Sequence, residues 1–213
     1  MQIPELKKTE DVLNRVMIKD NIATIVCLET KEPLQKTQLV IVNAHLHWDP
    51  QYKDVKLVQT AMLMQELQIF LKSLTPKGGR HPPVLICGDF NSLPDSGVYE
   101  FLGTGKVPQD HSDFSAYTYG EYTTRGLSHS LSLKSAYANV DVSYTNYTPG
   151  FKGVIDYVWF DSEVMTVSGV LGGVDREYMK NVVGLPNWHH PSDHIPLVVG
   201  VKLKQGMNKS LRV

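Results

Sequence analysis

Apolar residues along this chain form short strand-like runs around one long helical pattern. Residues 22–28 and 38–45 are rich in apolar and β-branched residues, and residues 31–33 between them include a proline, so the two runs predict a β-hairpin. From Val55 to Leu74 apolar residues recur at three- and four-residue intervals, which predicts a helix ended by Pro76 and the glycines after it.

The next apolar run, residues 84–87, predicts a strand buried on both faces. Gly88 breaks the run, and Asp89 and Asn91 follow it two positions apart, so on extended backbone their side chains would leave by the same face. A strand end followed by an ordinary Asp/Asn turn would also explain this pattern. The order strand, helix, strand is typical of an α/β layer.

The rest of the chain has weaker periodicity. The first twenty residues are polar and show no clear pattern, and residues 103–130 have the composition of a loop. We find no internal repeat and no linker, so the chain predicts one domain or part of one. The further predicted elements are short helices at residues 96–102 and 131–137 and strands at residues 154–160, 164–171 and 195–203.

Composition and net charge limit the functions that the chain can have. The chain has 213 residues, 42% of them hydrophobic, and a formal net charge of −1, so nucleic-acid binding would need a local patch or bound cations. Cys27 and Cys87 lie in apolar runs and predict free thiols in a reducing compartment. No run of about 18 apolar residues and no secretory segment is present, which predicts a soluble intracellular protein in which the sequons at Asn146 and Asn208 are chance matches.

Polar residues with catalytic potential accompany four of the predicted strands. Asp156 lies among apolar neighbours and needs a partner, for which an imidazole is suited. A lone histidine such as His45 could instead be a packed or surface residue, and Asp193-His194 could be only a turn. The positions with this potential are His45, Asp89, Asn91, Asp156, Asp193 and His194.

The chemistry of this set suggests a metal-assisted reaction. No glycine-rich phosphate loop, structural zinc spacing or recognisable Ser or Cys nucleophile is present. Carboxylate and amide oxygens with one or two imidazoles suit Mg²⁺ or Mn²⁺. Such an ion would favour an anionic substrate, and attack of water on a phosphoester is the reaction that fits.

Several motifs resemble known families. Gly88-Asp89-Phe90-Asn91 together with Ser192-Asp193-His194 resembles the endonuclease/exonuclease/phosphatase superfamily of metal-dependent phosphoesterases. Within it, residues 11–203 are similar to the carbon-catabolite-repressor-type poly(A) deadenylases, the exonuclease subunit of the NOT-scaffold complex. The motifs that carry this closer resemblance are Asn14–Asn21 (NRVMIKDN), His45–Pro50 (HLHWDP), Leu131–Tyr137 (LSLKSAY), Tyr144–Thr148 (YTNYT) and Phe151–Tyr157 (FKGVIDY).

The resemblance implies an α/β fold of two facing mixed β-sheets flanked by helices. Residues 1–205 would be the C-terminal portion of a single nuclease domain, and residues 206–213 a polar tail. The family's N-terminal half, with an Asn and the principal metal-binding Glu, is absent from this chain, as are the leucine-rich repeats that dock the enzyme on its scaffold. Glu29, Glu66 and Glu100 stand in no comparable context.

The resemblance also implies roles for individual residues. Asp89 would position or deprotonate the attacking water, Asn91 would orient the water and the phosphate, and His45 would bind the scissile phosphate. Asp156 would pair with His194. Pro50 and Phe151 would enclose the terminal adenine, with Asn91 against its face and Asn146 nearby, although Phe151 could also be an ordinary core aromatic. The metal-binding residues would be Asp89, Asn91, Asp193 and His194.

The function that follows is a Mg²⁺-dependent 3′–5′ exoribonuclease, with Mn²⁺ as a possible substitute. It would shorten poly(A) tails and release AMP in the cytoplasm and the nucleus. Its partners would be poly(A) RNA and the NOT-scaffold complex, with no membrane. Two alternatives stay open: a superfamily phosphoesterase acting on another substrate, such as a nucleotide cofactor or abasic DNA, and an inactive fragment that binds only RNA or a partner.

Overall fold

The computed structural model describes residues 6, 8–31 and 37–204. Most of the predicted turn at 31–33, the sequon at Asn208 and the predicted tail at 206–213 therefore lie outside the described residues. No helix within the described ranges is both long enough and apolar enough to span a lipid bilayer.

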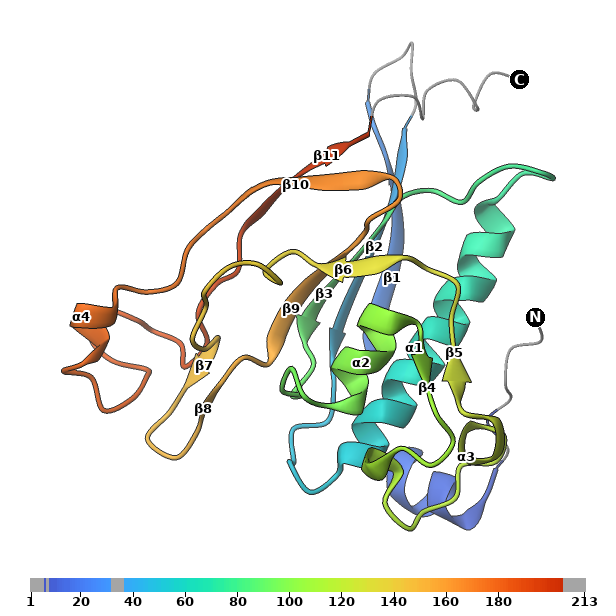
Figure 1. Ribbon diagram of the computed structural model, residues 1–213, viewed down its shortest axis with the longest axis horizontal. Helices are drawn as coiled ribbons and strands as arrows, with labels where there is room; N and C mark the ends of the chain where they lie inside the picture. Colours follow the sequence, from blue (N-terminus) through green and yellow to red (C-terminus); the bar gives the residue numbers. More distant parts are fainter. Residues whose placement is uncertain (1–5, 7, 32–36, 205–213) are drawn as a thin grey trace.

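A mixed five-stranded sheet forms the centre of the described structure (Figure 1). The strand order is β1-β2-β3-β9-β6; β2 and β3 are parallel, and the other neighbours are antiparallel. The strands are β1 (Ala23–Glu29), β2 (Gln38–His45), β3 (Val84–Asp89), β9 (Asp156–Asp161) and β6 (Leu133–Ser135).

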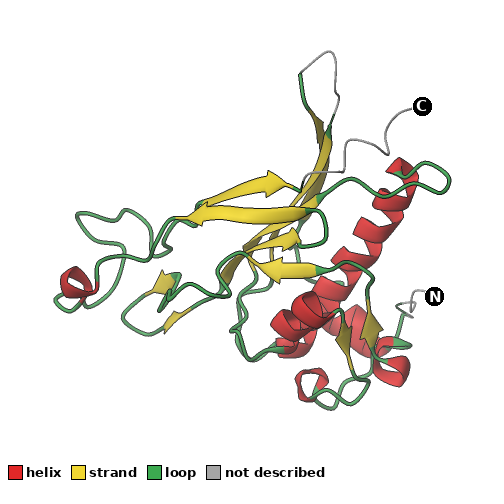
Figure 2. Ribbon diagram, turned by 45° about the horizontal axis from the view of Figure 1, so that its top comes forward, coloured by secondary structure: helices red, strands yellow, loops and turns green. Residues whose placement is uncertain are grey.

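The predicted hairpin and the predicted long helix are confirmed. β1 pairs with β2 from Ala23↔Ala44 to Glu29↔Gln38. Helix α1 (Lys53–Leu74) buries its apolar side chains in the main core, together with Val40 and Val42 of β2 and Ile86 of β3. It lies on one side of the sheet with the short helix α2 (Gly97–Thr104), which begins where the Ser96 side chain accepts a hydrogen bond from the Tyr99 amide (Figure 2).

β3 differs in one respect from the prediction of burial on both faces. Val84 and Ile86 are buried, whereas Leu85 and Cys87 on the opposite face are half-buried. Both cysteines are free thiols, as predicted, and each is half-buried.

The predicted helix at residues 131–137 is wrong. Leu133–Ser135 form strand β6, which pairs with β9 at the sheet edge through Leu133↔Asp161 and Ser135↔Trp159. The two end residues are buried and Lys134 between them is exposed, so this segment has the period of two that a strand requires.

Two further segments differ from the sequence prediction. The closing strand β11 (Val199–Leu203) is shorter than predicted, because residues 195–198 do not pair as a strand and the Ile195 amide bonds to the Thr145 carbonyl instead. The aperiodic N-terminal segment contains a turn of π-helix, η1 (Val12–Val16), held to α1 by the pair Arg15–Asp54 at 2.7 Å.

The remaining elements are short. Residues 103–130 are largely loop, as predicted, and contain β4 (Lys106–Val107), η2 (Ser112–Phe114), α3 (Tyr122–Arg125) and β5 (Leu127–Ser128). A lobe on the left of Figure 1 projects beyond the central sheet. It contains β7 (Asn146–Tyr147), β8 (Lys152–Gly153) and α4 (Arg176–Met179), while β10 (Met165–Val170) pairs with β11 above it.

Candidate active site

Three of the predicted catalytic residues lie in one row across three neighbouring strands. His45 is the partner of Asp89 in the parallel register of β2 and β3, and Asp89 is the partner of Asp156 in the antiparallel register of β3 and β9. Because β9 runs opposite to β3, its first residue meets the last residue of β3 at the same sheet edge. Asp156 is therefore at the start of its strand, not in the middle as predicted.

His194 joins the two carboxylates of this row. Its Nδ1 lies 2.9 Å from Asp156 Oδ2, and its Nε2 lies 3.8 Å from Asp89 Oδ2. His45 Nε2 approaches the same Asp89 oxygen at 3.5 Å from the other side. The imidazole partner that the sequence predicts for Asp156 is thus present, and Asp89 lies between two histidines.

The surroundings shift two pKa values in this group. Burial raises the pKa of Asp89, and the charge of Asp156 adds to this, while the amide of Asn91 and the two histidines oppose it. Burial by itself lowers the pKa of His194, but the hydrogen bond and the charge of Asp156 outweigh this and raise it. The pair formed by Asp156 and His194 therefore favours a protonated Nδ1 that donates to the carboxylate.

Asn91 has a left-handed backbone conformation that three hydrogen bonds hold in place. It is outside the strand, with φ at +46°, a conformation that L residues other than Asn and Asp rarely adopt. Its amide donates to Asp89 Oδ1 at 2.8 Å, and its Nδ2 donates to the Leu46 carbonyl at 3.0 Å. Its carbonyl accepts from Lys56 Nζ at 2.7 Å. Asp89 and Asn91 reach one site through this turn, not through extended backbone.

Lys56 is a site residue that the sequence reasoning missed. It is on α1 and only 5% exposed, and burial lowers its pKa. The signal was a charged residue between Val55 and Leu57, inside the apolar part of the helical pattern.

The projecting lobe supplies a second wall. Asn146 Nδ2 donates to Asp193 Oδ2 at 3.1 Å, and Asn146 bridges to His194 along the backbone. The Tyr147 amide donates to the Asp193 carbonyl, so β7 fixes the segment that carries both Asp193 and His194.

A cavity of about 660 Å³ opens between the sheet edge and this lobe. It includes nearly all the predicted site residues, and Asp156 lies directly behind His194. Phe151 is exposed on the cavity wall, so the alternative of a core aromatic is wrong. Trp48, Lys53 and Lys56 also line the cavity. The predicted site residues that line it are His45, Pro50, Asp89, Asn91, Asn146, Phe151, Asp193 and His194.

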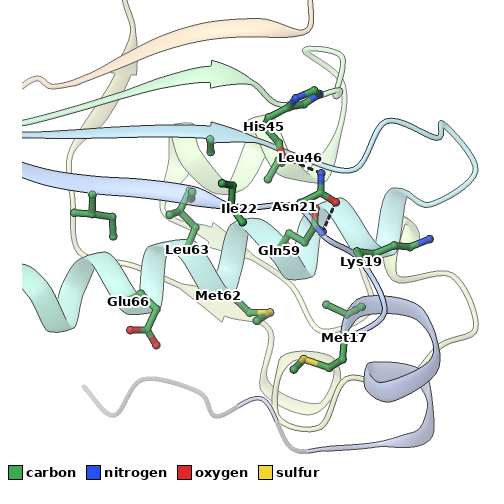
Figure 3. A pocket seen from close by; sticks show the side chains of 14 residues that line it. Met17, Lys19, Asn21, Ile22, His45, Leu46, Gln59, Met62, Leu63 and Glu66 are labelled. Carbon is green, nitrogen blue, oxygen red and sulfur yellow. Dashed lines mark hydrogen bonds between the residues drawn. The ribbon is translucent and has the colours of Figure 1, made fainter.

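A separate apolar groove of about 320 Å³ lies behind β2, between β1, η1 and α1. At its end the Gln59 amide donates to Asn21 Oδ1 at 3.1 Å, and the Asn21 amide donates to the His45 carbonyl at 3.0 Å (Figure 3). Gln59 Oε1 also accepts from the His47 amide. Helix α1 thereby holds the end of β2 through Gln59 and the turn after β3 through Lys56.

The donor set fits a divalent cation. Asp89, Asp156 and His194 offer ligand atoms that all lie within 4.8 Å of one another. Two carboxylates and an imidazole are suitable ligands for Mg²⁺, Mn²⁺ or Zn²⁺. Within the part of the chain that the structure describes, the half-buried Asp89 forms its ion pairs with His45 and His194.

Comparison with known proteins gives related sequences over nearly the whole chain. The CCR4-Not complex 3′-5′-exoribonuclease subunit Ccr4 of Mycosarcoma maydis is 47% identical over 223 residues, and that of Schizosaccharomyces pombe is 48% identical over 219 residues. These alignments cover 96% and 94% of this chain but 33% and 31% of the two relatives. The chain thus spans about a third of the length of these proteins, and the resemblance drawn from the motifs is confirmed.

Solved structures show the same fold. ANGEL2, a 2′,3′-cyclic phosphatase solved with adenosine-2′,3′-vanadate, has a TM-score of 0.73 at 24% identity, covering 94% of this chain and 65% of that one. The human Nocturnin catalytic domain with bound sulfate has a TM-score of 0.57 at 22% identity, covering 87% and 54%. The predicted α/β fold class is confirmed. A model of the endonuclease/exonuclease/phosphatase family matches residues 22–194, and with the two Ccr4 relatives it shows that this chain belongs to that family.

Proposed function

We propose that this chain forms part of a Mg²⁺-dependent 3′–5′ exoribonuclease that shortens poly(A) and releases AMP. The observation that carries the proposal is the group His45, Asp89, His194 and Asp156 at one sheet edge, open to a cavity. The similarity to the Ccr4 exoribonuclease subunits supports a 3′–5′ exoribonuclease, and membership of a CCR4-Not-type complex in the cytoplasm and nucleus is part of the same proposal.

The chain's own residues suit hydrolysis of a phosphoester. Asp89, with a raised pKa, accepts a proton from or orients the attacking water. Asp156 holds Nδ1 of His194, which aims Nε2 toward Asp89. The exposed ring of His45 is free to donate to the scissile phosphate and stabilise charge that develops there.

A bound cation would neutralise phosphate charge and lower the pKa of its water. Asp89, Asn91, Asp193 and His194 are the residues of this chain that we propose to hold it. The group of Asp89, Asp156 and His194 supports this location.

The adenine preference is proposed from the apolar cavity walls. Pro50 projects from the segment after β2, and Phe151 lies in the loop between β7 and β8, so the two can enclose a base between them. Stacking on such walls is worth about 1–3 kcal/mol per base. Asn91 and Asn146 offer amide groups to the base edge or its face.

A second candidate is a binding-only chain. The observation that favours it is that the chain spans about a third of the length of its relatives. In this candidate the cavity would bind the 3′ end of RNA without cleaving it.

Incubation of the purified chain with Mg²⁺ and a labelled RNA that ends in oligo(A) tests these proposals. Stepwise shortening from the 3′ end that is lost in Asp89→Ala and kept in the exposed Asp110→Ala control supports the enzyme. Binding without cleavage supports the second candidate. Shortening of an oligo(U) tail at the same rate would contradict the adenine preference, and an Asp89→Ala variant with full activity would contradict the mechanism.

A further inference from the structure

Trp48 has no role in the proposed function, yet its ring lines the catalytic cavity and is 70% exposed. We propose that this ring is a stacking site for the base that precedes the terminal nucleotide of a single-stranded RNA. The inference rests on the proposed function, because it takes the scissile phosphate to lie between these two nucleotides at His45 and Asp89.

The backbone on both sides of Trp48 is anchored. Before it, the Leu46 amide donates to the Asp89 carbonyl and the His47 amide donates to Gln59 Oε1, each at 3.0 Å. After it, the Asp49 side chain accepts from the Gln51 amide at 2.8 Å. An exposed ring on a fixed backbone loses little conformational freedom when a flat ligand covers it.

Trp48 shares one short segment with two residues assigned to the terminal nucleotide. His45 would contact the phosphate and Pro50 the terminal base, and Trp48 comes between them in sequence. Three residues extend about 10 Å at most, so the Cα atoms of His45 and Trp48 lie within that distance. The preceding base is joined through its own sugar to the scissile phosphate, so it must lie near that phosphate, in the cavity that Trp48 also lines.

The chemistry also favours an unpaired base. Every base has a π-face, so aromatic side chains bind single strands with little dependence on sequence. The chain has a net charge of −1 and therefore no overall basic surface to hold RNA by phosphate contacts. Exposed tryptophans also occur in protein interfaces, but this one shares its cavity with His45 and Asp89, which favours the RNA.

The test compares AMP with a phosphorothioate-linked adenylate dinucleotide, which resists hydrolysis, in the presence of Mg²⁺. The wild-type chain should bind the dinucleotide more tightly than AMP. Trp48→Ala should weaken dinucleotide binding about 5- to 100-fold and change AMP binding by less than about twofold, whereas Trp48→Phe should retain most of the affinity. Trp188 is 96% exposed and is not among the residues that line the catalytic cavity, so Trp188→Ala is the matched control and should change neither.

Fluorescence gives a direct readout of stacking. The chain has three tryptophans, and in a Trp188→Phe background the remaining two are Trp48 and the buried Trp159. The dinucleotide should quench Trp48 emission more strongly than AMP does.

The outcomes separate the two proposals. Equal affinity of AMP and the dinucleotide, or a Trp48→Ala variant that binds both like wild type, overturns the stacking site and leaves the proposed function intact. Failure of both nucleotides to bind the wild-type chain overturns the proposed function and the stacking site together. Loss of AMP binding in Trp48→Ala also overturns the stacking site, since the ring would then belong to the pocket of the terminal base.

Discussion

At the scale of single residues, we propose that Asp156 acts through His194 and does not itself touch a substrate. Its carboxylate accepts from His194 Nδ1 and has no other side-chain partner in the described residues. We expect Asp156→Asn to reduce cleavage of oligo(A) RNA about 10- to 100-fold, because an amide no longer favours protonation of Nδ1. Single-turnover rates measure this effect.

Asp161 provides the matched control for that substitution. It lies on the same strand β9, is buried where Asp156 is half-buried, and accepts from the Glu163 amide outside the cavity. Asp161→Asn should leave the cleavage rate near that of the wild type. Equal losses in both variants, with equal losses of thermal stability, would indicate a general effect on the strand and contradict the role given to Asp156.

Three residues show which members of the site can be identified from sequence alone. Asp156 was identifiable because a carboxylate among apolar residues needs a partner. Lys56 was missed, although it interrupts an apolar pattern, because the long side chain of a helical lysine usually carries its ammonium to water. Only the tertiary structure brings the Asn91 carbonyl to this ammonium. Trp48 was likewise indistinguishable from a core aromatic until its exposure was known.

At the scale of elements, β3 depends on a glycine at its penultimate residue. Gly88 has φ at +140°, and a Cβ there would lie 1.9 Å from the Ala44 carbonyl oxygen of β2. Gly88→Ala should therefore lower the free energy of unfolding by about 3 kcal/mol or more, through backbone strain and the clash combined. Denaturant unfolding followed by far-UV circular dichroism measures this change.

Gly169 on β10 is the control for Gly88. It has no positive φ, and a Cβ there would meet no atom within 4 Å. Gly169→Ala should be neutral or should stabilise by up to about 1 kcal/mol. An unfolding free energy for Gly88→Ala equal to that of the wild type would show that β2 and β3 can separate without loss, against the register described here.

Helix α1 positions the active site through its first turns. Lys56→Met removes the ammonium that holds the Asn91 carbonyl while keeping a side chain of similar length. We expect a loss of stability of about 1–3 kcal/mol from the unsatisfied carbonyl, and a larger fall in kcat than in substrate affinity. Cleavage kinetics and amide exchange at the Asn91 turn measure the two effects.

The exposed Lys72 in the last turn of α1 allows a matched comparison. Lys72→Met should alter neither the kinetics nor exchange at Asn91. A Lys56→Met enzyme with normal kcat would show that the left-handed turn holds without the ammonium.

Elements were predictable from sequence where they have strong periodicity. Helix α1 and the pair β1–β2 follow the pattern closely. β6 was mistaken for a helix because three paired residues are too few for periodicity to identify, and its pairing with β9 is a tertiary contact. The row of His45, Asp89 and Asp156 depends on strand register, which a single sequence does not specify.

At the scale of the whole molecule, the apolar groove behind β2 is open at its mouth. Ile22, Met17 and Met62 line it, and Ile22 is 81% exposed. Exposed apolar grooves of this kind bind hydrophobic dyes. We expect the folded chain to bind 8-anilinonaphthalene-1-sulfonate with a fluorescence increase, and we expect Ile22→Lys to reduce that increase because a charged head at the mouth opposes entry of the apolar rings.

Ile69 is the control for this last prediction, since it is an exposed isoleucine on α1 that does not line the groove. Ile69→Lys makes the same side-chain replacement at an exposed position and adds the same charge, but it should leave dye fluorescence near the wild-type level. Equal decreases in the two variants would mean that the dye responds to net charge or to general surface apolarity. Because the groove ends at Asn21 and Gln59, which hold the His45 carbonyl and the His47 amide, dye binding should also alter the amide exchange of His47. A dye that binds without this change would indicate that the groove is mechanically separate from the catalytic edge.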